Sequence, residues 1–215
     1  MIKAVIYDMD GILIDSEPLW REAEMITFGR VGLNFTEAMC RETMGMRLYE
    51  VVEYWHAKTP WGGMSLEEVE AALLEKVTEL IMQKGFPLSG VKESIEHFKS
   101  KGCKIALASS SALSLIKSVL KKLQLENDFE VINSAEHLSY GKPHPEIFIR
   151  TAHDLNVKPI DCLVIEDSFH GVLAAKSALM KVIAVPDDEN KNDKRFNIAD
   201  YQLNNLNEIH SITIE

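Results

Sequence analysis

Two aspartates, Asp8 and Asp10, stand two residues apart directly after the apolar run Ala4–Tyr7. Carboxylates placed in this way at the end of a strand can converge on one cation or on one reacting group. Gly11 follows them and would let the chain turn sharply there. A polar turn that ends the strand explains the same residues, because an Asp-x-Asp pattern is short and common in an acidic chain. The pair alone leaves both interpretations open.

Similar polar groups follow three further apolar runs, and each has a simpler explanation of its own. The run Ser109–Ser111 could cap a helix, and so could Glu166 and Asp167, while Lys142 could be an ordinary surface lysine. In a parallel sheet, however, all of these ends lie at one edge, where open α/β folds bind ligands. Four strand ends equipped in this way favour a single site with four carboxylates, one lysine and several hydroxyls.

A sheet must position these groups, and the apolar runs predict one. They are continuously apolar rather than alternating, which is typical of strands covered on both faces. The expected strands are Ala4–Tyr7, Lys104–Ala108, Val131–Asn133, Cys162–Ile165 and Val182–Val185, and helical patterns at Ala112–Leu123, Glu146–Leu155 and Gly171–Leu179 separate the last four. This alternation predicts an α/β fold with a Rossmann-like, doubly wound parallel sheet.

One stretch, residues 15–88, interrupts the alternation. It contains no good strand but three helical patterns, at Leu19–Phe28, Leu48–His56 and Leu66–Met82. Ser65 and Glu68 fit a capping box at the start of the third pattern. We therefore expect a core domain made of residues 1–14 and 89–215, with an inserted helical domain made of residues 15–88.

The composition narrows the classes of partner. With a net charge of −10 in 215 residues, the chain has no basic excess for nucleic acid or an anionic membrane. No apolar run approaches the roughly 18 residues of a membrane span, and no signal-peptide core precedes Asp8. Cys40, Cys103 and Cys162 lack CxxC spacing and are interpreted as reduced thiols. We expect a cytoplasmic protein, and a monomer.

The four polar groups together resemble the motifs of the haloacid dehalogenase superfamily. The segment Asp8-Met9-Asp10-Gly11-Ile12-Leu13-Ile14-Asp15-Ser16-Glu17 is similar to the first motif, Ser109 matches the second, Lys142 the third, and Glu166 with Asp167 the fourth. They occur in the family's order over essentially the whole chain. One subfamily carries a helical cap where the insertion lies, so the resemblance implies the superfamily's core fold with an inserted cap domain.

Three further segments resemble bacterial sugar phosphatases of the hexitol phosphatase, or 2-deoxyglucose-6-phosphatase, type: Ser16–Trp20, Trp55–Trp61 and Asn192–Phe196. The β-phosphoglucomutases are near relatives of that group. They carry a histidine ten residues after the second aspartate of the first motif, where this chain has Trp20. The departure argues against mutase activity.

The resemblance implies a Mg²⁺-dependent phosphatase that works through an aspartyl-phosphate. Asp8, the backbone carbonyl of Asp10, and Asp167 would hold the metal, with Glu166 binding directly or through water. Asp8 would attack phosphorus. Asp10 would protonate the departing sugar oxygen and then take a proton from the attacking water.

Substrate contacts follow from the same resemblance. The phosphate would be bound by residues of the first three motifs: Asp8, Met9, Asp10, Ser109, Ser110 and Lys142. Arg47 belongs to a segment, Gly45–Arg47, that resembles the family's specificity loop, and it could hydrogen-bond sugar hydroxyls or be an ordinary surface arginine. The expected substrate is a small phosphorylated sugar or polyol.

Alternatives remain beside this interpretation. One is a β-phosphoglucomutase. Another is a 2-haloacid dehalogenase, which uses the same nucleophile without metal and is disfavoured by Asp10 and by the Glu166–Asp167 pair. A third, of a different class, is a catalytically silent binding protein on the same scaffold, which the intact motifs disfavour. A nucleotide-binding oxidoreductase is disfavoured because no GxGxxG follows the first strand.

Overall fold

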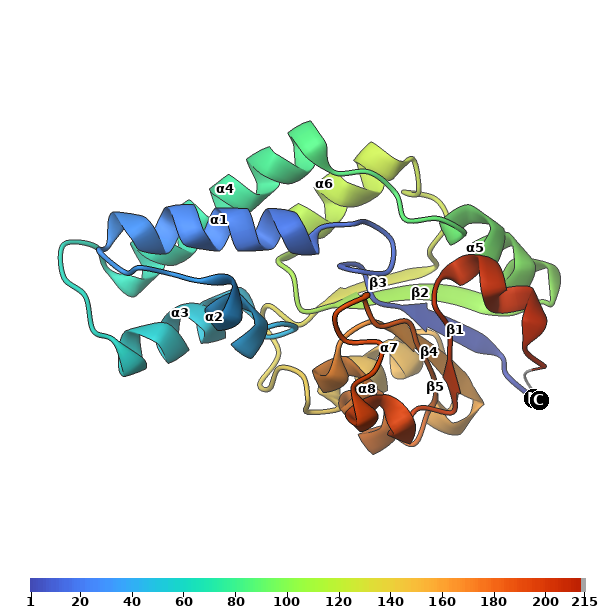
Figure 1. The fold of residues 1–215 in the computed structure, drawn as a ribbon. Helices are drawn as coiled ribbons and strands as arrows, with labels where there is room; N and C mark the ends of the chain where they lie inside the picture. The colour runs from blue at the N-terminus through green and yellow to red at the C-terminus, as the bar shows by residue number, and fades with distance from the viewer. Residues whose placement is uncertain (214–215) are drawn as a thin grey trace.

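The computed structural model describes residues 1–213. A parallel sheet carries helices on both faces, and a further group of helices lies beyond the carboxyl ends of its strands (Figure 1). Ile214 and Glu215, the last two residues of the expected core segment, lie outside the described residues. No helix among the described residues is long and apolar enough to cross a membrane.

The sheet has six strands in the order β3-β2-β1-β4-β5-β6, and all neighbouring strands are parallel. Their bounds are β1 Ala4–Tyr7, β2 Lys104–Ser109, β3 Val131–Ser134, β4 Cys162–Glu166, β5 Lys181–Ala184 and β6 Tyr201–Gln202. The strand order reverses at β1, which confirms the predicted doubly wound sheet. The bounds of the five predicted strands shift by one residue at most. Strand β6 was not predicted, because two residues leave no periodic signal.

Side chains along each strand point alternately to the two faces of the sheet, and each face packs into its own hydrophobic core. The strands are therefore apolar throughout. Val5 and Tyr7 of β1 pack on the side of α5 (Val91–Ser100) and α6 (Leu113–Leu123), which lie above the sheet in Figure 1. Ala4 and Ile6 pack on the side of α7 (Glu146–Asp154) and α8 (Phe169–Ser177), which lie below it. Covering both faces leaves the carboxyl edge of the sheet free for a site.

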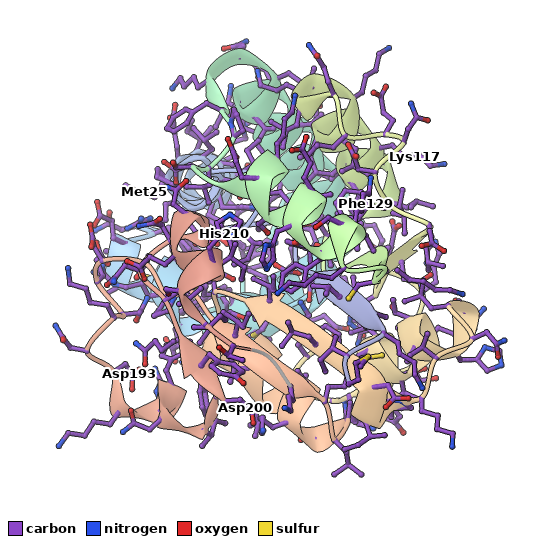
Figure 2. All side chains as sticks on the ribbon, turned by 90° about the vertical axis from the view of Figure 1, so that its right-hand side faces the viewer. Met25, Lys117, Phe129, Asp193, Asp200 and His210 are labelled. Carbon is purple, nitrogen blue, oxygen red and sulfur yellow. The ribbon has the colours of Figure 1, made fainter. Side chains whose placement is uncertain are left out.

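Helix α5 was not predicted, although Val91, Ile95 and Phe98 have helical spacing and are all buried. Gly90 stands at its N-terminus with a φ of 85°, a conformation that favours glycine. The short 3₁₀ helix η3 (Leu206–Ser211), which carries His210 in Figure 2, packs on α5. The last described helix therefore packs against the core.

Four helices between β1 and α5 lie together beyond the carboxyl ends of the strands (Figure 1). They are α1 (Glu17–Arg30), α2 (Glu37–Glu42), α3 (Leu48–Lys58) and α4 (Leu66–Lys84), and we call them the cap helices. Phe28 stacks on Phe35 with ring centroids 4.4 Å apart, and Trp61 and Trp55 pack edge-on against this pair. Trp55 and Trp61 therefore belong to the aromatic core of the cap helices.

Candidate active site

The polar groups that follow the strands meet in one cavity under the cap helices. Asp8 follows β1, Ser109 ends β2 and Asp167 follows β4, and Lys142 joins them from the loop after β3. The opposite wall comes from α1, the segment 43–46 and α3. The parallel sheet thus brings together residues up to 159 positions apart in the chain, from Asp8 to Asp167.

Lys142 lies at the bottom of this cavity as a buried counterion. Its side chain is 2% exposed, and its ammonium donates a hydrogen bond of 2.7 Å to Asp8 Oδ1 and another to Glu166 Oε1. Burial opposes the charge of Lys142, but Asp8 and Glu166 outweigh burial and raise the pKa of the ammonium. Lys142 is therefore a charged group of the site and not a surface lysine.

Three carboxylates surround this single ammonium. Asp8, Glu166 and Asp167 are buried, and each offers an oxygen within 4.8 Å of the other two. Burial raises the pKa of Asp8 to about 8, against the opposing field of Lys142, and burial together with Glu166 raises the pKa of Asp167 well above its usual value. When ionised, these three carboxylates carry more negative charge than one ammonium can balance, which adds to burial in raising the pKa values of Asp8 and Asp167. A hard divalent cation with oxygen ligands fits such a set of donors.

Two glycines allow the chain to approach these carboxylates closely. A Cβ on Gly11 would lie 2.0 Å from Asp167 Oδ2, and Gly11 also adopts a φ of 69°. A Cβ on Gly171, in the first turn of α8, would lie 1.8 Å from Glu166 Oε1. Both distances are far inside van der Waals contact, so a side chain at either position would displace a carboxylate of the site.

Asp10 is held apart from the other carboxylates by three side-chain donors. Its Oδ1 accepts hydrogen bonds from Ser16 Oγ at 2.6 Å and from Trp20 Nε1 at 2.9 Å, and its Oδ2 accepts one from Ser111 Oγ at 2.7 Å. Ser16 stands at the N-terminus of α1 but makes no capping hydrogen bond with its side chain there. The Asp10 side chain thus faces the cap, as expected if only its backbone carbonyl binds a metal.

The remaining predicted phosphate contacts are placed as follows. Ser109 is buried in the cavity wall, where its hydroxyl accepts a hydrogen bond from the Ser111 N–H at 3.1 Å. Ser110 also lines the cavity, and its hydroxyl donates to the Gly45 carbonyl of the segment before α3 at 2.9 Å. The side chain of Met9 is fully buried in the core. Only the backbone of Met9 is therefore available for the predicted contact.

Arg47 makes contacts that differ from those expected at a sugar. It is 3% exposed, and its guanidinium donates to the carbonyl of Leu138 at 2.7 Å, to Tyr49 Oη at 2.7 Å and to Glu50. These partners link the start of α3 to the loop after β3. Arg47 does not line the cavity that holds Asp8. The expected contact with sugar hydroxyls stays a prediction, and the guanidinium would have to leave these partners to make it.

Sequence reasoning singled out Trp20 but missed Glu17, Arg21 and Glu24, the other side chains by which α1 lines the cavity. Glu17, Trp20, Arg21 and Glu24 all face it and have the i, i+3, i+4, i+7 spacing of one helix face. This spacing was a readable signal, but polar residues on an amphipathic helix are ordinarily assigned to solvent. Only the docking of α1 over the strand ends turns this face into a wall of the site.

The comparisons with known proteins agree with this geometry. Residues 5–185 match the haloacid dehalogenase-like hydrolases. The chain belongs to this family. The resemblance inferred from the four motifs is confirmed.

Two curated relatives and one solved structure refine the assignment. Hexitol phosphatase B of Escherichia coli (strain K12) is 39% identical over 209 residues, which cover 97% of this chain and 94% of that protein. A phosphorylated carbohydrates phosphatase of Thermotoga maritima is 36% identical over 181 residues, with 82% of each chain covered. The crystal structure of a β-phosphoglucomutase from Clostridium difficile aligns with a TM-score of 0.84 at 27% identity, covering 97% of this chain and 93% of that one. This haloacid dehalogenase-like hydrolase is accordingly an enzyme, and a phosphatase.

Proposed function

We propose that this chain hydrolyses monophosphates of small sugars or sugar alcohols, such as hexitol phosphates and 2-deoxyglucose 6-phosphate, with Mg²⁺ as cofactor. The observation that carries the proposal is that Asp8, Lys142 and Asp10 line one cavity between the strand ends and the cap helices. The names of the Escherichia coli and Thermotoga maritima relatives support the substrate class.

Asp8 is the nucleophile in this proposal. A phosphate monoester is a dianion that repels a carboxylate, so catalysis depends on positioning and on neutralising charge. The Lys142 ammonium, 2.7 Å from Asp8, supplies fixed positive charge beside the attacking oxygen. A carboxylate oxygen of Asp8 forms a bond to phosphorus while the bond to the sugar oxygen breaks, which leaves an aspartyl-phosphate.

Mg²⁺ would be held by Asp8, Asp167 and the backbone carbonyl of Asp10, with Glu166 binding directly or through water. When bound, it would supply positive charge that balances the three carboxylates and the phosphate oxygens. Ser109 offers a hydroxyl donor in the same wall, and the N–H groups of Met9, Asp10 and Ser110 are further candidate donors.

Asp10 is the general acid and the general base in this proposal. It protonates the departing sugar oxygen and later removes a proton from the water that attacks the aspartyl-phosphate, so one carboxyl is first an acid and then a base. Ser16, Trp20 and Ser111 fix both of its oxygens in the cavity. These three donors orient the Asp10 carboxyl toward the space above Asp8 that the leaving group would occupy in this proposal.

We further propose that residues 15–88 act as a cap domain over a core made of residues 1–14 and 89–215. Contacts between the parts include a hydrogen bond from Ser110 Oγ to the Gly45 carbonyl and one from Arg47 to the Leu138 carbonyl. Closure over bound substrate would exclude water from the aspartyl-phosphate until the leaving group has gone. A cytoplasmic location and a monomeric state belong to the same proposal.

The proposal is tested by phosphate release from a panel of hexitol and hexose monophosphates, with Mg²⁺ and after chelation. We expect release only with metal, and loss of release in Asp8→Asn. The matched control is Asp161→Asn, which removes a carboxyl that pairs with Lys3 away from the site. Failure of the wild-type protein to release phosphate from any member of the panel would contradict the proposal.

The β-phosphoglucomutase alternative has the structural similarity in its favour, and Trp20 against it. Incubation with β-glucose 1-phosphate and a bisphosphate primer separates the two activities. We expect free phosphate as the product. Accumulation of glucose 6-phosphate would instead support the mutase.

A further inference from the structure

Helix α1 leads from the proposed acid/base into the cap. Its N-terminus lies near the strand ends, and the helix runs away from the sheet (Figure 1). Trp20 contacts Asp10, and Glu24 lies one turn further along the same cavity-lining face, about 6 Å away along the helix axis. Glu24 therefore lines the end of the cavity that is remote from the phosphate-binding residues.

Glu24 is a buried carboxyl with unused hydrogen-bonding capacity. It is 7% exposed, and the thiol of Cys40 is its hydrogen-bond partner. Within residues 1–213, no lysine or arginine forms an ion pair with it, and the neighbouring Arg21 instead pairs with Glu189 at 3.5 Å. Burial raises the pKa of Glu24 to about 7. A carboxylate can accept about four hydrogen bonds, and one thiol satisfies few of them.

We propose that Glu24 accepts hydrogen bonds from hydroxyl groups at the end of the substrate remote from the phosphate, and so determines specificity for polyhydroxylated monophosphates. This inference rests on the proposed function and names the residue that recognises the sugar or polyol part of the substrate. Hydroxyl groups are neutral donors, so they satisfy a buried carboxyl without bringing a countercharge. Leaving such an acceptor without donors is costly, which gives the site a preference for substrates that supply them.

The same end of the cavity disfavours a second phosphate. Glu24 is the carboxyl at this end, whereas Glu17 lines the same cavity about 10 Å nearer the strand ends along the helix axis. Arg21, the cation on this helix face, is already paired with Glu189. A bisphosphate would place its second dianion against the buried Glu24 carboxyl. The cavity therefore selects monophosphates that carry several hydroxyls.

The test compares Glu24→Gln and Glu24→Leu with the wild-type enzyme on three substrates. A hexitol monophosphate carries hydroxyls remote from the phosphate, phenyl phosphate carries none, and a hexitol bisphosphate carries a second phosphate. The readout is the ratio of kcat/KM values between substrates, which a general loss of folded enzyme does not change. Circular dichroism and thermal unfolding confirm that each variant folds.

We expect the ratio for hexitol monophosphate over phenyl phosphate to fall roughly ten- to hundred-fold in Glu24→Leu, because hydrogen bonds to a charged acceptor are lost. Glu24→Gln retains one acceptor oxygen and should lie between the wild type and Glu24→Leu. Both variants should raise the relative rate on the bisphosphate. The matched control is Glu22→Gln on the same helix, since Glu22 pairs with Lys84 away from the cavity, and its ratios should equal those of the wild type.

Equal effects of Glu24→Leu on all three substrates would overturn the inference and leave Glu24 as a structural residue. Unchanged ratios in both variants would overturn it as well. A wild-type enzyme that hydrolyses phenyl phosphate but no polyol phosphate would overturn the substrate class and with it this inference. A wild-type protein that hydrolyses none of the three would overturn the proposed function itself, so the two failures are distinguishable.

Discussion

The indole nitrogen of Trp20 donates a hydrogen bond of 2.9 Å to Oδ1 of Asp10. A side chain of the first cap helix thus fixes the carboxyl that we propose as the acid and base of the core. The indole N–H is a donor that cannot titrate at ordinary pH, so the hydrogen bond to Asp10 does not depend on a charge change of its donor. Docking of α1 and orientation of Asp10 are therefore coupled through this hydrogen bond and through the one from Ser16 to the same oxygen.

Trp20→Phe should lower kcat roughly ten-fold and change KM little, because an aromatic ring remains while a hydrogen bond that orients the Asp10 carboxyl is lost. Steady-state kinetics on a hexitol monophosphate provide the measurement. The control is Trp61→Phe, which removes an indole N–H that has no hydrogen-bond partner among the described residues. If the Trp20 variant turned over at the wild-type rate, orientation of Asp10 would have to depend on the two serines alone.

Asp10→Asn should slow phosphate release by roughly 10²–10⁴-fold, the usual contribution of general acid–base catalysis. Metal binding should persist, because the predicted metal ligand at this position is the backbone carbonyl. Titration calorimetry with Mg²⁺ and a phosphate-release assay measure the two effects on the same sample. Loss of metal binding together with activity would place the Asp10 carboxylate among the ligands and contradict the assignment.

Lys142→Ala should lower kcat/KM by roughly 10²–10³-fold, because a fixed charge beside the nucleophile is lost. It should also lower the free energy of unfolding, since Asp8 and Glu166 would remain buried without their counterion. Lys142→Arg should restore little activity, because a planar guanidinium does not replace a compact ammonium. Wild-type kinetics in a folded Lys142→Ala protein would show that this ammonium takes no part in the reaction.

Much of the site was predictable from the sequence because parallel strands end at one edge. Asp8, Ser109 and Asp167 follow apolar runs, so the doubly wound sheet alone brings them together. The family resemblance then identified Lys142, whose local sequence offers no sign that its side chain is buried. Contacts of this kind depend on which strands are neighbours and not on the residues beside them in the chain.

The cap side of the site was not predictable in the same way. The hydrogen bond from Trp20 to Asp10 and the position of Glu24 depend on the angle at which α1 crosses the strand ends. The contact of Arg47 was not predictable either, because its guanidinium donates to the carbonyl of Leu138, which is 91 residues away in the chain. Helical spacing can identify the face of a helix, but only tertiary docking decides whether that face meets solvent or a cavity.

Glu24→Gln should stabilise the metal-free protein at high pH and not at low pH. The pKa of Glu24 is raised to about 7 in the folded protein from an ordinary value of 4.5, so folding binds a proton between these values. The wild type therefore loses stability relative to the variant as pH rises through this window, by on the order of 3 kcal/mol once both states are ionised. Urea unfolding of both proteins near pH 5 and near pH 8, in the presence of a chelator, measures the difference. A stability difference that does not change with pH would contradict the expected cost of burying this charge.

The nucleophilic role of Asp8 is tested most directly by trapping the phosphoenzyme. The wild-type enzyme and Asp8→Asn are mixed with Mg²⁺ and a hexitol monophosphate, quenched in acid within one turnover, and digested for mass spectrometry. We predict a phosphoryl group on the wild-type peptide that contains Asp8, no phosphoryl group on the same peptide of Asp8→Asn, and no phosphate release by that variant. Phosphate release by Asp8→Asn at a rate near that of the wild type, or a phosphoryl group on a different residue, would contradict the account.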